Sequence, residues 1–69
     1  MESLAEALLK EQARVRELIV MYRDPALNGA GNLAAAMMEQ SLAAADRAIV
    51  SGDVVSMIRC YEDLKGYEA

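Results

Sequence analysis

The chain has 69 residues, 55% of them apolar, with a net charge of −4 at pH 7, no histidine and one cysteine. The lack of histidine and of a second thiol excludes an internal disulfide, an ordinary zinc site and catalytic sets that depend on histidine. A domain this small is only marginally stable without disulfides or metals. We therefore expect a single domain over residues 1–69 that is completed by homodimerisation.

The first predicted helix, over about residues 3–22, carries a broader apolar arc than one packing partner can cover. Ser3 and Glu6 have the spacing of a capping box, and Glu6 and Lys10 that of an i,i+4 ion pair. The main apolar stripe contains Leu4, Leu8, Val15, Ile19 and Tyr22, with Gln12 inside it, and a second strip contains Leu9, Ala13 and Val20. The polar back holds Glu6, Lys10, Arg14 and Glu17. This helix is expected to form the dimer, and the candidate interface residues are Leu8, Leu9, Val15, Ile19 and Val20.

The second predicted helix covers about residues 32–51 and follows a short connection. Pro25 ends the first helix, because proline cannot continue the hydrogen-bond ladder and restricts the residue before it. Asn28-Gly29 has the chemistry of a turn, and Asn32 is the expected N-cap. The main stripe contains Met38, Leu42, Ala45 and Ile49, and a second face contains Met37, Ala44 and Ala48. The many alanines predict a central helix that neighbouring backbones can approach closely.

The third predicted helix covers about residues 53–65. Gly52 suits the left-handed position that ends the second helix, and Asp53 can cap the next one. A single core stripe follows, made of Val54, Met57, Ile58, Tyr61 and Leu64. Gly66 ends the helix and leaves residues 66–69 as a frayed tail. The predicted fold is therefore all-α, with three helices, of which the second and third form an antiparallel hairpin.

No motif in the chain indicates catalysis, a cofactor or a bound metal. The lysines and paired carboxylates such as Glu62-Asp63 fall on solvated helix surfaces, so we do not expect an enzyme. Gly29-Ala30-Gly31 precedes a helix as phosphate-binding loops do, but no strand comes before it and no lysine lies nearby, which favours an ordinary turn. Cys60 is expected to be a small buried hydrophobic residue.

Nucleic-acid binding and membrane insertion both match the chain poorly. Ala48 and Gly52 have the spacing of a helix-turn-helix, but the candidate recognition helix offers only Arg59 as an early cation, and the chain is acidic. A small DNA-binding regulator remains one alternative, beside a purely structural homo-oligomer. Met1-Glu2-Ser3 lacks the basic region of a secretory signal, and no window approaches the roughly 18 apolar residues that span a bilayer. We therefore expect a cytoplasmic protein.

Surplus apolar surface on an acidic chain favours a non-enzymatic protein-binding module. Met21 and Met37 lie off the main stripes of their helices, and flexible methionines suit irregular partner surfaces. Tyrosine and arginine contribute heavily to binding at protein interfaces. The candidate partner-binding residues are Arg16, Met21, Tyr22, Arg23 and Met37. The Tyr22-Arg23 end of the first helix is expected to lie near Met37.

Three parts of the chain resemble small helical proteins encoded by transposable, Mu-like temperate phages. These parts are Leu4–Leu9 with Arg14–Glu17, then Ala45–Ala48, and Ser51–Ile58. Some small early proteins of such phages inhibit host proteins, including an anti-quorum-sensing protein that blocks a LuxR-type activator and the type IV pilus assembly ATPase. The resemblance implies a dimeric host-protein inhibitor in the bacterial cytoplasm, and it assigns no binding motif to particular residues.

Overall fold

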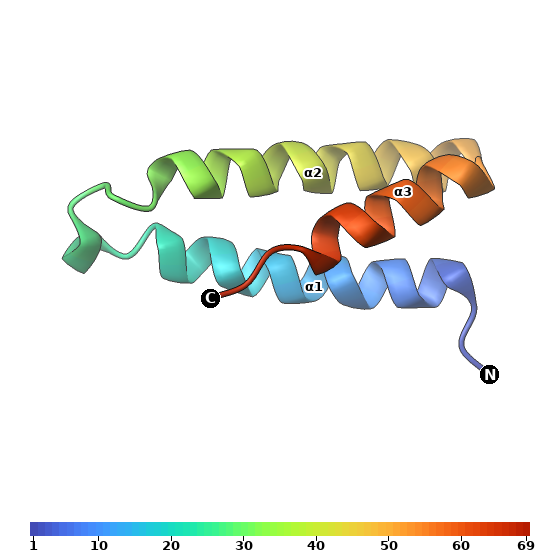
Figure 1. The fold of residues 1–69 in the computed structure, drawn as a ribbon, viewed down its shortest axis with the longest axis horizontal. Helices are drawn as coiled ribbons and strands as arrows, with labels where there is room; N and C mark the ends of the chain where they lie inside the picture. The colour runs from blue at the N-terminus through green and yellow to red at the C-terminus, as the bar shows by residue number, and fades with distance from the viewer.

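The computed structural model describes all 69 residues, as three α-helices and one 3₁₀ turn (Figure 1). The helices are α1 (Leu4–Tyr22), α2 (Asn32–Ser51) and α3 (Val54–Lys65), and the turn η1 (Pro25–Leu27) lies between α1 and α2. α1 and α2 lie side by side along the 39 Å long axis, and α3 crosses them obliquely. The all-α class and the three helices are confirmed, with bounds within about one residue of those predicted.

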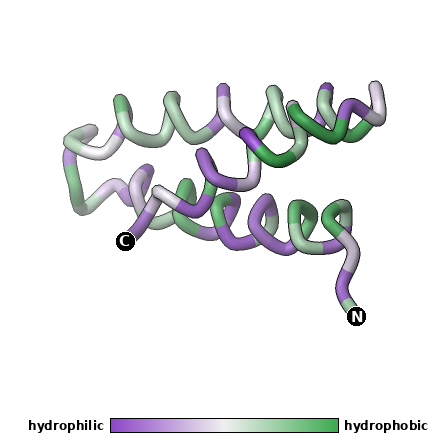
Figure 2. The backbone as a smooth tube through the Cα atoms, turned by 45° about the vertical axis from the view of Figure 1, so that its right-hand side comes forward, coloured by the Kyte–Doolittle hydropathy of each residue, from purple (hydrophilic) through white to green (hydrophobic).

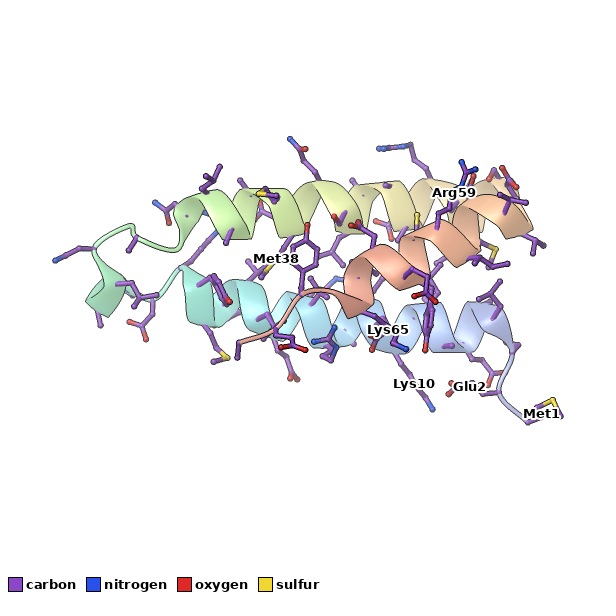
Figure 3. All side chains as sticks on the ribbon, in the orientation of Figure 1. Met1, Glu2, Lys10, Met38, Arg59 and Lys65 are labelled. Carbon is purple, nitrogen blue, oxygen red and sulfur yellow. The ribbon has the colours of Figure 1, made fainter.

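The core lies where the main stripes of the three helices meet. Met38 points from α2 into this space (Figure 3), and apolar residues occur along every helix rather than in one block (Figure 2). The buried cluster consists of Leu8, Val15, Leu18, Met38, Leu42, Ala45, Ala48, Met57 and Leu64. Full burial of a large aliphatic side chain stabilises a fold by about 1.5–3 kcal/mol, so this cluster holds the helices together. The predicted main stripes of α1 and α2 are confirmed.

Side chains at two helix starts satisfy backbone amides as the sequence predicts. Ser3 Oγ accepts a hydrogen bond from the amide of Glu6 at 3.1 Å. Asp53 Oδ1 accepts from the amides of Val55 at 3.2 Å and Ser56 at 3.4 Å, and the Ser56 hydroxyl donates to Asp53 Oδ2 at 2.7 Å. The hydrogen bonds from the hydroxyl and the amide of Ser56 lower the pKa of Asp53. Both caps supply partners that the first turn of a helix lacks.

Glycines set the geometry of both connections. Gly52 ends α2 with a φ of 69°, and Asn28-Gly29 turns the α1–α2 connection with φ values of 50° and 81°, as predicted. The N-cap of α2 is Gly31 and not the predicted Asn32, which is the first residue of the helix. The carbonyl of Gly31 accepts the first helical hydrogen bond, from the amide of Ala35 at 3.0 Å, so α2 begins one residue earlier than expected. A Cβ at Gly31 would lie 2.1 Å from the carbonyl oxygen of Tyr22. Only glycine lets the two helix ends approach this closely.

The predicted single core stripe of α3 is only partly correct. Met57 and Leu64 are buried and Tyr61 is half-buried, but Val54 is 58% exposed and Ile58 is 48% exposed. α3 packs against α1 and α2 on one side and meets no helix on its other side. Its apolar arc is wider than the side that these helices cover. Like α1 and α2, α3 therefore leaves apolar surface exposed.

Arg14 links α1 to the carboxyl end of α3. Its guanidinium donates one hydrogen bond to the carbonyl of Leu64 and one to the carbonyl of Tyr67, both at 2.8 Å. Glu11 holds the same guanidinium through two hydrogen bonds of 3.3 Å. We predicted that Arg14 lies on the polar back of α1. In the structure it bonds to one carbonyl in the last turn of α3 and to one carbonyl in the tail.

The segment over residues 66–69 is docked against α1 and α2, which corrects the prediction of a frayed tail. The Tyr67 hydroxyl lies 2.9 Å from Ser41 Oγ of α2, and the Tyr67 ring packs against the core. The Tyr22 hydroxyl of α1 donates to the carbonyl of Glu68. With the Arg14 contact, these bonds tie the tail to two helices.

Polar side chains also define how α1 lies against α2. Gln12 is buried, and its Nε2 donates to Asp46 Oδ1 of α2 at 2.7 Å. At the start of α1, Lys10 pairs with Glu2 and not with the predicted Glu6. The Lys10 side chain is 75% exposed, so this ion pair contributes little to stability. The Gln12–Asp46 hydrogen bond is one polar contact that sets the position of α2 along α1.

Candidate protein-binding surfaces

The side chains offer little reactive chemistry. No group of three or more His, Cys, Asp or Glu side chains is placed to hold a metal ion. Cys60 is half-buried, and burial raises the pKa of its thiol, with the nearby Asp63 adding to the effect. A thiol with a raised pKa stays protonated at neutral pH and is a poor nucleophile. Beside these groups, the structure has exposed surfaces that a second protein could contact.

None of the three helices combines the length and the apolar character needed to cross a bilayer.

The structure divides the candidate dimer residues between the core and the surface. Leu8 and Val15 are fully buried within one chain, and Ile19 is half-buried against the same core. Leu8 and Val15 have no surface to offer a second chain, because α2 and α3 already cover the main stripe of α1; the structure corrects this part of the prediction. Leu9 is 53% exposed and Val20 is 73% exposed. A self-association face on α1 therefore depends on these two residues.

Leu9 and Val20 belong to a line of exposed residues that we term the α1 seam. The α1 seam comprises Leu9, Ala13, Arg16 and Val20, at positions i, i+4, i+7 and i+11. At 100° per residue these side chains fall within an arc of about 60°. Their spacing is that of the a and d positions of a coiled coil, where apolar residues meet a second helix. The α1 seam is thus a face that another helix can cover.

The end of α1 forms a small apolar pocket with the α1–α2 connection, which we term the corner pocket. It is lined by Met21, Tyr22, Leu27, Ala30 and Gly31. Tyr22 is half-buried and bonded to the tail, so its ring is a fixed wall, whereas Met21 and Leu27 are exposed. A pocket of this kind suits a single apolar side chain of a partner.

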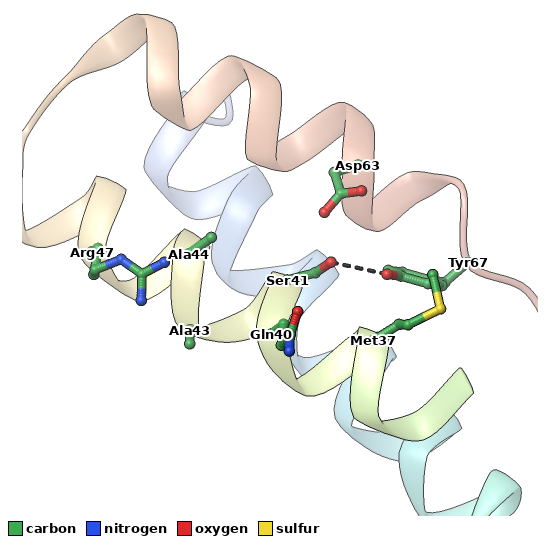
Figure 4. A pocket seen from close by; sticks show the side chains of 8 residues that line it. All are labelled: Met37, Gln40, Ser41, Ala43, Ala44, Arg47, Asp63 and Tyr67. Carbon is green, nitrogen blue, oxygen red and sulfur yellow. Dashed lines mark hydrogen bonds between the residues drawn. The ribbon is translucent and has the colours of Figure 1, made fainter. Parts of the chain in front are cut away.

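The five residues predicted for partner binding, Arg16, Met21, Tyr22, Arg23 and Met37, do not form one surface. Met21 and Tyr22 line the corner pocket, and Arg16 lies on the α1 seam. Arg23 pairs with Glu39 of α2, with Nη2 and Oε2 at 3.2 Å. Met37 lines a separate groove with Tyr67 and shares no pocket with Met21 or Tyr22 (Figure 4).

That separate groove runs between α2 and α3, and the sequence-based reasoning missed it. One end is lined by Met37 and Tyr67 (Figure 4), and the other by Arg47 and Arg59. Ala44 and Arg47 line both hollows, which are therefore neighbours, and we term the two together the α2–α3 groove. The alanines of α2 were a signal for close approach. The groove was not predicted, because Tyr67, which lines one end of it, was expected to lie in a frayed tail.

Unpaired cations distinguish these surfaces on an otherwise acidic chain. Arg47 and Arg59 in the α2–α3 groove form no ion pair within the chain, and neither does Arg16 on the α1 seam. Arg14 and Arg23, in contrast, are held by carboxylates. A free guanidinium can form bidentate hydrogen bonds with a carboxylate of a partner.

Comparison of the chain with models of protein families, with characterised proteins and with solved structures finds no match. The functional proposal therefore depends on the surfaces described above and on the resemblance of the three sequence segments.

Proposed function

We propose that the chain is a non-enzymatic protein-binding module that acts as a homodimer and inhibits or modulates a host protein. The target class follows the resemblance to small phage proteins: a LuxR-type quorum-sensing transcriptional activator, the type IV pilus assembly ATPase, or both, in the bacterial cytoplasm. The observation that carries the proposal is the number of large apolar side chains left exposed once the core is filled. These side chains are Leu9, Val20, Met21, Leu27, Leu33, Met37, Val50, Val54, Val55 and Ile58.

The corner pocket and the α2–α3 groove suit a partner protein better than isolated exposed side chains would. In the corner pocket, Met21 and Leu27 flank a hollow that one aromatic or aliphatic anchor can fill. In the α2–α3 groove, Ala44 lets a partner backbone approach, and Arg47 and Arg59 can pair with its carboxylates. In this proposal α2 and α3 act as one unit, an antiparallel hairpin whose outer side receives the target.

Binding to purified candidate targets tests the proposal. The tagged protein is mixed with a LuxR-type activator or with the pilus ATPase, and complex formation is measured together with retention of the activator on its promoter DNA. We expect capture of one target and, for the activator, release from DNA. Met21→Glu in the corner pocket and Arg47→Glu in the α2–α3 groove change exposed residues and should weaken capture, whereas Glu62→Ala on the exposed side of α3 should not. A wild-type protein that binds neither target, and recovers no specific protein from host lysate, refutes the proposal.

A purely structural homo-oligomer is the second candidate, and the α1 seam is the observation that favours it. That function predicts a stable assembly in sedimentation without capture of a host protein. The DNA-binding alternative predicts a different result, namely retardation of duplex DNA by this protein alone, weakening steeply as salt rises.

A further inference from the structure

We propose that the α1 seam pairs with the α1 seam of a second copy of this chain, antiparallel, about a two-fold axis that passes between Ala13 and Arg16. This inference rests on the homodimer of the proposed function and adds the face, the direction and the register. The seam lies on the side of α1 away from Arg14, which faces α3. Leu9 and Val20, its large apolar residues, have no partner within the chain.

The charges along α1 determine the direction of pairing. From the start of the helix to its C-cap, the positions in line with the seam are Glu6, Leu9, Ala13, Arg16, Val20 and Arg23. In a parallel dimer each position meets its own copy, so Glu6 faces Glu6 and Arg16 faces Arg16, and such like-charge contacts oppose association. In the antiparallel arrangement Leu9 meets Val20, Ala13 meets Arg16, and Glu6 approaches Arg23, which also pairs with Glu39 of its own chain. Every layer then joins apolar with apolar, acid with base, or a long side chain with a small one.

The rim of the seam is self-complementary in the same arrangement. Lys10 and Glu17 occupy equivalent heptad positions, one residue after Leu9 and one after Arg16. Across an antiparallel pair these positions face each other, so Lys10 of each copy lies beside Glu17 of the other. Glu17 has no ion-pair partner within the chain. Lys10 points outward from α1 (Figure 3) and pairs only with the exposed Glu2.

Small residues leave room for the second helix. At the two-fold axis Ala13 accommodates the aliphatic stem of Arg16, whose guanidinium can extend to the solvated rim. On the adjoining side of α2, Ala36 and Ala43 are exposed, within one helical turn of Glu39 at the edge that meets α1. No bulky side chain at these two positions of α2 obstructs the approach of a second α1.

Sedimentation equilibrium of the purified full chain, at nanomolar to micromolar concentrations, tests this interface. We expect a dimer for the wild type. Lys10→Glu and Glu17→Lys should each raise the dimer Kd by roughly 3- to 10-fold, because symmetry repeats each like-charge contact. The combined variant K10E/E17K should return the Kd to within about two-fold of the wild type. Val20→Asp should raise it by at least about ten-fold, because it places a charge in the apolar seam.

Val55→Asp is the matched control, because Val55 is also more than half exposed but lies on α3. It should leave the Kd unchanged, and circular dichroism verifies that every variant keeps its helices. A wild type that stays monomeric, a dimer indifferent to Val20→Asp, or a double variant no better than the single ones overturns the interface. Sedimentation measures self-association alone and not the binding of a target. A dimer of this kind that captures no host protein refutes the proposed target and leaves the interface standing, whereas a monomer that captures one refutes the interface and the homodimer and leaves target binding standing.

Discussion

Arg14 should contribute more to stability than any other charged side chain, and Arg14→Ala measures that contribution. Its guanidinium donates to the carbonyl groups of Leu64 and Tyr67 at 2.8 Å, where α3 ends and the tail begins. Alanine removes both donors and the positive charge near the carboxyl end of the α3 dipole. The last carbonyls of α3 and the tail then lose the side chain that holds them to α1.

The expected loss is about 2–3 kcal/mol. A hydrogen bond from a charged donor contributes about 1.5–3 kcal/mol, and two such bonds set an upper range of about 3–6 kcal/mol. The Arg14 side chain is 37% exposed, so water replaces part of what is lost and the expected loss falls below that range. Marginal stability of about 0.05–0.15 kcal/mol per residue gives a 69-residue chain roughly 3.5–10 kcal/mol in total. The variant should therefore lose a large fraction of its free energy of unfolding.

Urea unfolding followed by far-ultraviolet circular dichroism gives the measurement, at one protein concentration because self-association shifts apparent stability. Arg47→Ala removes an arginine that makes no ion pair, and should change stability by no more than about 0.5 kcal/mol. Arg14→Lys keeps the charge but loses the forked donor geometry, so an intermediate loss is expected. If Arg14→Ala destabilises the protein no more than Arg47→Ala does, the contribution assigned to Arg14 is wrong.

Three further predictions concern single positions. Gly31→Ala should lower the free energy of unfolding by about 2 kcal/mol or more, because its Cβ would overlap a carbonyl oxygen of α1. Gly66→Ala should be nearly neutral, because the atom nearest to its Cβ would lie at 3.4 Å. Thermal unfolding of the two variants distinguishes these outcomes. Hydrogen bonds from Ser56 lower the pKa of Asp53, so the ionised carboxylate stabilises the fold above the ordinary pKa of 3.8. This stabilisation is lost as the pH falls through the lower pKa of the folded state. The Tm difference between wild type and Asp53→Ala should therefore shrink below about pH 3.8. An unchanged difference at low pH would contradict this. The raised pKa of Cys60 predicts slower alkylation at about pH 8 in the folded protein than in urea, measured by mass spectrometry, and equal rates would argue against a protected thiol.

The helices were predictable because their signals are local. The period of 3.6 in α1 and α2 identifies the buried stripe, and the Ser3 and Asp53 caps mark helix starts through residues only three positions away. The predicted N-cap of α2 was wrong. Asn32 is the better capping residue by type, but the carbonyl of Gly31 already accepts a helical hydrogen bond, and Gly31 lies against the end of α1 where only glycine fits.

The surfaces were less predictable, because periodicity shows which side of a helix is apolar but not which neighbour covers it. Leu8 and Leu9 both belong to apolar strips of α1, yet one is fully buried and the other is 53% exposed. The α2–α3 groove depends on where Tyr67 docks, and that position follows from bonds to Arg14 and Ser41 distant in the sequence. Such contacts leave no local pattern.

The docked tail also has a consequence for the order in which the protein folds. Tyr22 and Arg14 bond to carbonyl groups 46 and 53 residues further along the chain, at Glu68 and Tyr67. Contacts between residues so distant in the sequence form more slowly than helices do. α1 and α2 can therefore pair before Tyr67 docks, while the far end of α3 still has no anchor. Docking of the tail is thus expected as a late folding step, and a stopped-flow experiment on Tyr67→Ala would show the loss of a slow phase.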